Sequence, residues 1–559
     1  MLTLRLSLTG ILLLFGWSLL SVPTQAGPRE ELLKLVPEDV GFCMVVNDLR
    51  GHSKHLGEGP LRKFQQSPLF HLMLRKQEAQ KFSRFAEEVK LHLRVDWQQL
   101  RDDIFGDCVV FGYQHNLPNA PDQERGLLML WAQNPVLLGK LIDRVNLADG
   151  VQKIGKRQHK NSVYFHRREK NQEQYYLIRG PIFVMTSDEP TIRQVIERFA
   201  DESVGKNSSL VRSFDKLPNK SALATFWINP RAFDNDLAKQ IDQAEPDDAQ
   251  ILKTLRTYWQ ALDAAAVSLT LKDSVGLHLS VQGRPQSLPR AATTFYANST
   301  GQSDLWSKFP DDAVFTLAAH TDLTSAFAVL EEFMPREEQQ KFRQGLQAAL
   351  GAAFGRDFQK EILPSVGPDW GFCIAPSKTD SPFPDMFLAM KLQPDKGAAP
   401  KEWLRIAIFV SQLGCLEYNK KNADMMRLKT IVQQGEDVTV LESVILPGAI
   451  RPTVSLKDGY LLVTSSPQAR LRFKKQTKVP VNPPIMRFSF QQLNTTIQEQ
   501  RENILKMIRK KDVDTANVLE VWLFPQIDQH LQVLQTLELQ QSSSADQMTW
   551  SLRLKFSGN

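Results

Sequence analysis

The sequence predicts an α+β fold built from two tandem copies of one module, each a mostly antiparallel sheet with helices packed on one face. Two observations lead to this prediction. Strand-like segments that alternate apolar and polar residues recur along the chain, with helix-like segments between them. The same order of elements then occurs twice, at spacings of about 260 to 280 residues. At 559 residues the chain also exceeds what a single hydrophobic core organises.

Composition places the chain among ordinary globular proteins. Apolar residues make up 42% and charged residues 23% of the sequence, which fits neither wholesale disorder nor a polytopic membrane protein. The formal net charge is only +6 over 559 residues. A nucleic-acid partner normally requires a concentrated basic face, so we expect no such partner.

The N-terminal stretch, positions 1–26, has the pattern of a targeting segment. Arg5 precedes an apolar run over positions 6–20, and small residues at 24–26 follow Pro23. The run is shorter than the roughly 20 residues that span a bilayer. We therefore predict a signal peptide over positions 1–26 and export to the periplasm, cell envelope or extracellular space, with an uncleaved N-terminal anchor as the alternative. No later stretch is apolar enough to predict a transmembrane span.

The predicted copies cover residues 27–290 and 291–559. Residues 37–42 are answered 273 positions later by residues 310–315, and both stretches predict a turn that enters a strand. Five further matches follow in the same order. They pair residues 105–111 with 367–374, 126–131 with 386–392, 182–187 with 460–465, 224–228 with 486–490, and the terminal hairpin 267–281 with 534–554.

Helices fill the gaps between these strands. Asn134 and Pro135 predict a capped helix start in the first copy, and Pro400 opens the corresponding helix in the second. An apolar residue at every fourth position predicts one buried helix stripe, formed by Phe342, Leu346, Leu350 and Phe354. Core packing is the interpretation that we favour for this stripe, and a lipid-facing groove is the alternative.

The common catalytic signatures do not occur in the sequence. There is no Gly-x-Ser-x-Gly, His-Glu-x-x-His, phosphate-binding loop, Gly-x-Gly-x-x-Gly or Cys-x-x-Cys motif. The carboxylate pairs at 102–103, 311–312 and 331–332 are adjacent in sequence, which predicts turns and helix ends rather than acid–base chemistry. We expect no cofactor, and a non-enzymatic protein is the favoured interpretation.

Two further groups of residues raise the question of metal binding and disulfide bonding. His52 and His55 form a His-x-x-His pair, but zinc would need a third ligand, so a solvated loop is the favoured interpretation. Cys43 and Cys108 could pair in an oxidising compartment. Both lie in apolar, strand-like runs, which is typical of small buried thiols.

The main candidate binding site is a stretch over residues 156–170, which we call the basic hairpin. Its cations could bind an anionic glycan, a phospholipid head group or an acidic partner. The alternative is a strand edge whose charges only prevent association with other chains. The candidate residues are Lys156, Arg157, Lys160, His166, Arg167 and Arg168. A second basic stretch over residues 470–478 does not align with it.

Four stretches carry a resemblance to a known family: residues 36–40, 95–107, 126–130 and 164–168. Together they resemble a group of exported bacterial proteins known only as a domain of unknown function. The resemblance covers mainly residues 36 to 200. It implies a location in the envelope or outside the cell and an α+β fold, and it carries no catalytic residue.

The functional hypothesis from the sequence is a non-enzymatic, exported binding or scaffold protein of the cell envelope, whose partner is an envelope protein, a glycan or a lipid. One alternative is a carrier of a lipid or other hydrophobic ligand, in which helices over a curved sheet leave an apolar pocket. A second alternative is a hydrolase without a recognised motif, and His166, His278 and His320 are the histidines to inspect for it.

Overall fold

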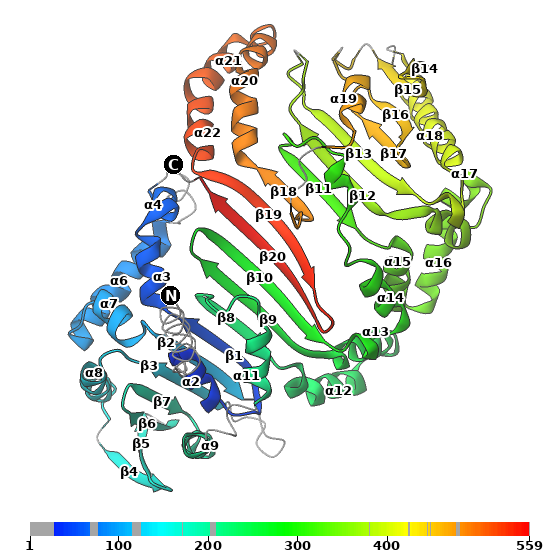
Figure 1. Ribbon diagram of the computed structural model, residues 1–559. Helices are drawn as coiled ribbons and strands as arrows, with labels where there is room; N and C mark the ends of the chain where they lie inside the picture. The colour runs from blue at the N-terminus through cyan, green and yellow to red at the C-terminus, as the bar shows by residue number, and fades with distance from the viewer. Residues whose placement is uncertain are drawn as a thin grey trace, which may run out of the picture. The chain divides into compact units, whose positions relative to one another are not determined.

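The computed structural model describes residues 27–557 except 67–75, 115–124, 152, 170–171, 202–207, 380, 423–424, 444, 448 and 477–480. The predicted signal peptide lies outside the described residues. The fold is α+β (Figure 1), and the registered strand pairs are antiparallel, which confirms the predicted class.

The chain forms two compact units. Among the described residues, unit 1 comprises those within 27–38, 45–50 and 89–216, and unit 2 comprises those within 39–44, 51–88 and 217–557. Three elements change unit within their length: β1 (Val40–Asn47), α3 (Leu49–Leu56) and α6 (Lys76–Leu93). These compact units are not the two predicted copies, because the predicted boundary at residue 290 follows the similarity between two stretches of sequence.

Unit 1 contains a sheet in which each strand pairs antiparallel with the next. In spatial order its strands are β2 (Cys108–Gln114), β3 (Arg125–Trp131), β7 (Ile182–Thr186), β6 (Gln172–Arg179), β5 (Ser162–Glu169) and β4 (Ile154–His159). Its helices include α2 (Pro28–Leu35), α7 (Trp97–Gln99), the π-helix η1 (Leu100–Ile104), α8 (Pro135–Ala148), α9 (Glu189–Ala200) and α11 (Ser209–Lys216).

Local sequence explains where the helices of unit 1 begin. The Asn134 side chain accepts a hydrogen bond from the Leu137 amide at 3.0 Å, and Pro135 occupies the first turn of α8, as the sequence predicts. Asp188 caps α9 in the same way through the Thr191 amide at 2.8 Å. Both caps satisfy amides that have no partner inside the helix.

Unit 2 contains a longer antiparallel sheet. In spatial order its strands are β8 (Ala224–Ile228), β9 (Leu262–Leu271), β10 (Ser274–Gly283), β20 (Gln547–Phe556), β19 (Leu534–Ser543), β18 (Met486–Ser489), β11 (Phe315–His320), β12 (Val366–Ala375), β13 (Asp385–Leu392), β17 (Tyr460–Thr464), β16 (Thr453–Lys457), β15 (Glu436–Ser443) and β14 (Met426–Gln433).

Most helices of unit 2 lie between successive strands in the sequence. They include α4 (Gly59–Gln65), α12 (Asp234–Gln243), α13 (Pro246–Gln260), α14 (Arg290–Asn298), α15 (Leu323–Glu332), α16 (Arg336–Leu346), α17 (Ala352–Phe354), α18 (Pro400–Lys421), α19 (Pro467–Arg472), α20 (Phe490–Arg509), α21 (Val513–Val518) and α22 (Phe524–Leu531). Residues of the predicted helix stripe pack against different partners. Phe342 stacks on Phe327 with ring centroids 5.3 Å apart, whereas Phe354 packs edge-on against Trp403 with ring centroids 4.7 Å apart.

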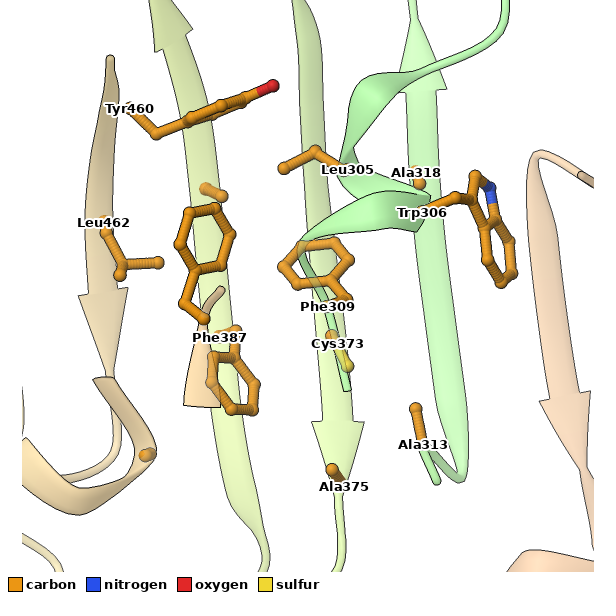
Figure 2. Close-up of a cluster of buried hydrophobic side chains, with 13 residues drawn as sticks. Leu305, Trp306, Phe309, Ala313, Ala318, Cys373, Ala375, Phe387, Tyr460 and Leu462 are labelled. Carbon is orange, nitrogen blue, oxygen red and sulfur yellow. The ribbon is translucent and has the colours of Figure 1, made fainter. Parts of the chain in front are cut away.

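The core of unit 2 lies on one side of strands β11, β12, β13 and β17. Figure 2 shows Phe309 and Phe387 near Cys373 and Leu462, with Tyr460 above them. The Phe309 ring lies 6.2 Å from that of Phe387 and 5.9 Å from that of Phe473, both in tilted or edge-on geometry. These side chains are almost completely shielded from solvent.

Successive residues of these strands face opposite sides of the sheet. Along β12 each residue that is buried alternates with one that is only partly buried, over all ten positions. Phe387 and Leu388 on β13 show the same contrast, because Phe387 is fully buried whereas Leu388 is 52% exposed. The sheet of unit 2 therefore has one packed side and one side that is incompletely covered.

This contrast gives a paired test of the fold. We expect Phe387→Ala to lower the free energy of unfolding by about 3–5 kcal/mol, because it opens a cavity in a packed core. The adjacent substitution Leu388→Ala should change it by only about 0.5 kcal/mol, since Leu388 is half exposed. Urea denaturation of both variants measures the difference, and equal losses would contradict the assignment of the two sides.

Candidate functional site

The incompletely covered side of the unit 2 sheet is apolar. One row of residues in mutual register crosses eleven consecutive strands, from β8 to β16, and every member of the row is apolar. The row is Ala224, Leu269, Leu277, Leu552, Leu539, Met486, Leu317, Phe372, Leu388, Val463 and Val454. None of these residues is fully buried.

Neighbouring positions on the same side extend this surface, which we call the open apolar face. They are Phe226, Val267, Leu279 and Trp550 on strands β8 to β20, and Phe488, Phe315, Ile374 and Met386 on strands β18 to β13. Leu277 at 49% and Leu388 at 52% are its most exposed leucines. Exposed apolar surfaces of this extent mark sites of interaction in soluble proteins.

One part of this side is covered within unit 2. The buried Leu61 of α4 belongs to a small cluster with Leu534 and Phe556, and Val275 and Leu554 pack against that cluster. Val275 and Leu554 are cross-strand neighbours, and each lies two positions from a member of the row. The open apolar face therefore begins beside a packed edge.

On strands β9, β10 and β20, the side of the sheet opposite the open apolar face carries buried polar residues. His278 lies at its centre, with Nδ1 2.8 Å from the Ser551 hydroxyl oxygen and Nε2 3.0 Å from that of Thr270. Burial, with a smaller effect from Arg553, lowers the pKa of His278 below its usual range. A neutral imidazole between two hydroxyls and without a carboxylate holds the strands together, but it lacks the acid of a catalytic triad.

His320, unlike His278, has an acidic partner. Its Nδ1 lies 2.8 Å from Asp369, whose side chain is 2% exposed, and Lys391 lies 3.3 Å from the other carboxylate oxygen. No serine, threonine or cysteine among the described residues forms a hydrogen bond with Nε2 of His320. The hydrolase alternative therefore has a serine–histidine pair without an acid and an aspartate–histidine pair without a nucleophile, on different strands.

The third histidine, His166, belongs to the basic hairpin in unit 1. Its Nε2 forms a hydrogen bond with Glu173, and its ring stacks on Tyr175 at 5.0 Å. Arg168 lies 3.5 Å from the same Glu173. Arg157 forms an ion pair with Glu189 and lies over the Tyr175 ring.

The other members of the basic hairpin lie elsewhere. Arg167 is buried on the opposite side, where Asn146 at 2.8 Å and Asp149 at 3.0 Å accept its hydrogen bonds. Lys156 and Lys160 are exposed, and neither forms an ion pair with a described residue. The six candidate residues are thus split between two sides of a hairpin and four are paired with acidic groups, so the anionic-ligand site stays a prediction with two uncommitted lysines.

The remaining candidates have structural roles. His52 is buried in α3 and its Nδ1 lies 2.8 Å from the Leu271 carbonyl oxygen, whereas His55 is exposed. The described residues contain no cluster of three or more potential metal ligands. Cys43, Cys108, Cys373 and Cys415 are buried, and none of them forms a disulfide bond. Burial raises the pKa of Cys108 and of Cys373 to about 12, so both stay protonated at neutral pH.

The acidic pairs are also engaged in structure. Arg101 donates two hydrogen bonds to Asp102, and Arg472 lies 2.5 Å from Asp312. Glu331 accepts from Arg343 at 2.6 Å, while Glu332 accepts from the Tyr258 hydroxyl at 2.6 Å. One or both carboxylates of each pair are thus neutralised or hydrogen-bonded, which differs from the two free carboxylates in one cleft that acid–base catalysis requires.

Two cavities adjoin His320 in unit 2. One has a volume of about 690 Å³ and the other about 490 Å³, and Thr300, Gly301 and His320 line both. A β-carbon on Gly301 would lie 2.7–2.8 Å from the His320 ring, so this position needs a glycine for the ring to fit. The sequence predicted His320 only as a histidine near a strand.

Comparison with known proteins adds little to this geometry. No family model matches the chain, and no curated protein matches it. Two solved structures, crystal forms III and I of TP0453, are similar at 12% and 9% identity with TM-scores of 0.24 and 0.21. They cover 45% and 46% of this chain and 78% and 80% of the other chain. Similarity at this level supports no conclusion on fold or function. Within the described part of the chain, no helix combines the length and hydropathy needed to cross a bilayer.

The network around Glu189 in unit 1 predicts a pH-dependent contribution to stability. Burial opposes ionisation of Glu189, but hydrogen bonds from Tyr164, Arg157 and Arg193 outweigh it and lower its pKa to about 2. Because the folded pKa lies below the unfolded value near 4.5, this stabilisation is present above about pH 4.5 and is lost as the pH falls towards 2.

We therefore expect Glu189→Gln to reduce the free energy of unfolding by about 1–3 kcal/mol at pH 7 and by much less at pH 3. Urea denaturation at both pH values measures this. The control is Glu197→Gln, which removes an exposed partner of His159 from the same helix. A loss for Glu189→Gln that is the same at both pH values would contradict the assignment.

Proposed function

We propose that this chain is a non-enzymatic, exported binding protein of the cell envelope whose ligand is a long-chain lipid, held by its hydrocarbon chain along the open apolar face. The observation that carries the proposal is the row of eleven apolar residues in register across the unit 2 sheet. Export rests on the apolar run and small residues of positions 1–26.

The dimensions of the row suit a hydrocarbon chain. Eleven strands have ten spacings of about 4.8 Å, which gives a strip about 48 Å long. One leaflet of a bilayer contributes about 15 Å of hydrocarbon, which is half of the roughly 30 Å core. The strip therefore has room for one or more acyl chains laid across the strands.

The chemistry of the row favours a lipid over a protein partner. Protein interfaces place about one hydrogen bond in every 100–200 Å² and are enriched in tyrosine and arginine. The row contains leucine, methionine, phenylalanine, valine and alanine, and none of these side chains forms a conventional hydrogen bond. A hydrocarbon chain needs no hydrogen bonds, so it is the occupant that leaves nothing unsatisfied.

The form of the carrier differs from the one expected from sequence. A pocket between sheet and helices was the form expected, but in unit 2 that space holds the packed cluster around Phe309 and Phe387. The apolar surface instead lies on the other side of the same strands. This arrangement supports an open binding strip rather than an enclosed cavity.

We further propose that the chain arose by duplication of a ten-stranded module. In unit 1 the strands after β2 pair in the order β2, β3, β7, β6, β5, β4, and in unit 2 those after β12 pair in the order β12, β13, β17, β16, β15, β14. Strands β8 to β10 and β18 to β20 then close each copy as a strand and a hairpin.

The pairing of β10 with β20 supports the same proposal. His278 faces Ser551, and their numbers differ by 551 − 278 = 273. The first sequence match has the same offset, since 310 − 37 = 273. If the copies correspond at this offset, the two hairpins meet about a local two-fold axis through this pair, and each copy supplies an equivalent part of the strip.

The test is binding of a pyrene-labelled long-chain fatty acid to the purified full chain. We expect saturable binding, and we expect the double variant Leu277→Gln and Leu388→Gln to weaken it about tenfold or more, because each leucine loses part of its apolar contact with the hydrocarbon chain. Both leucines are about half exposed, so the variant should fold normally, which circular dichroism and a thermal melt verify.

Val481→Gln is the matched control, because Val481 is a highly exposed apolar residue outside the row. The control should bind like the unmodified chain. Absence of binding to the unmodified chain, or equal binding by the double variant, would refute the lipid proposal. Sedimentation that shows a dimer disrupted by the double variant would assign the face to a second copy of the chain instead.

A further inference from the structure

The smaller of the two cavities, beside β11, β19 and β20, has a lining of a different kind from the open apolar face. Its side chains are mostly amides and hydroxyls, such as those of Gln302, Asn482, Gln540 and Ser551. Among the described residues that line it there is no aspartate or glutamate, and Arg553 is the only lysine or arginine. Its volume of about 490 Å³ lies within the roughly 300–1,000 Å³ that is usual for small-molecule sites.

We propose that this cavity binds a short acidic saccharide, that is, a hydroxyl-rich ligand with one carboxylate. Amide and hydroxyl side chains both donate and accept hydrogen bonds. Sugar hydroxyls do the same, so a lining of this composition can satisfy several ring hydroxyls at once. Gln302 already bonds to Asn482 at 3.4 Å and Ser551 to His278 at 2.8 Å, so a sugar hydroxyl would add to hydrogen bonds that the lining already forms.

Arg553 supplies the charge that selects the carboxylate. No described carboxylate lies within ion-pairing distance of its guanidinium. Glu538 faces Arg553 across strands β19 and β20, but it is paired with Lys555 at 2.8 Å. A guanidinium binds a carboxylate through two parallel hydrogen bonds, which gives orientation as well as affinity.

His320 lines both this cavity and the larger one. Asp369 holds Nδ1 at 2.8 Å, and Nε2 has no hydrogen-bond partner among the described residues. The larger cavity includes Asp322, whose carboxylate accepts hydrogen bonds from Asn298 and Ser325 at 2.7 Å. That acidic group disfavours a second anion, so the carboxylate of the ligand belongs beside Arg553 and a neutral ring beside His320.

The site belongs to the second copy of the module only, if the proposed duplication holds. At the offset that relates the two copies, His320 corresponds to Asn47 and Arg553 corresponds to Ser280. Neither the imidazole nor the guanidinium therefore has a counterpart in the first copy. The inference itself does not depend on lipid binding, because the cavity and the row are lined by different residues.

The experiment compares glucuronate with glucose as probes, by isothermal titration of the full chain. We expect glucuronate to bind at least tenfold more tightly than glucose, and Arg553→Gln to weaken glucuronate by about tenfold or more while the affinity for glucose stays within about twofold. Gln540→Leu should weaken both probes, because it removes contacts to ring hydroxyls.

Arg290→Gln is the matched control, since Arg290 begins α14 and lines neither cavity. It should bind both probes like the unmodified chain. Arg553→Lys keeps the charge without the planar fork, and we expect it to bind glucuronate with an affinity between those of the unmodified chain and Arg553→Gln. This variant provides the test if Arg553→Gln folds poorly. The inference is overturned if glucuronate does not bind the unmodified chain. It is also overturned if glucuronate binds and neither Arg553 variant alters its affinity.

Discussion

The antiparallel pair of β10 with β20 is the interaction on which unit 2 depends. Nine residues of each strand are in unbroken register, from Ser274 opposite Lys555 to Gln282 opposite Gln547 (Figure 1). A shift of one residue in an antiparallel pair would move every side chain to the other side of the sheet. It would place His278 on the apolar side and Leu277 among the buried polar groups. The register of this one pair therefore decides that both hairpins turn their apolar residues to the same side.

Polar contacts reinforce that register from the buried side. The His278 to Ser551 contact at 2.8 Å and the Ser280 to Thr549 contact at 3.0 Å both cross from β10 to β20. Buried polar groups are costly unless they are paired, so each contact penalises any other register. The described apolar residues of the row form no such directional bonds, so the polar side is the one that determines the strand register.

Much of the fold follows from local sequence, and the reason is the two-residue period of strands. The strand at 182–187, the capped helix after Asn134 and the terminal hairpins were all predictable, because each depends on residues close in the chain. The pairing of β10 with β20 was not, since its partners come from opposite halves of the sequence. Alternation also predicts one wet and one dry side for an antiparallel strand, whereas Leu277 and Leu388 place apolar residues on the wetter side.

The candidate sites show the same limit from the side of charge. Arg157, His166, Arg167 and Arg168 form a basic run in sequence, but Glu189, Glu173 and Asp149 neutralise them from other elements. Arg553 is the opposite case, because nothing in its local sequence distinguishes it from an ordinary strand-edge cation. Its acidic cross-strand neighbour Glu538 forms an ion pair with Lys555 instead. Arg553 is the one guanidinium among the described residues that line the smaller cavity beside His320. The number of cations in a segment therefore does not show which charges remain uncompensated after folding, because the acidic partners come from other elements.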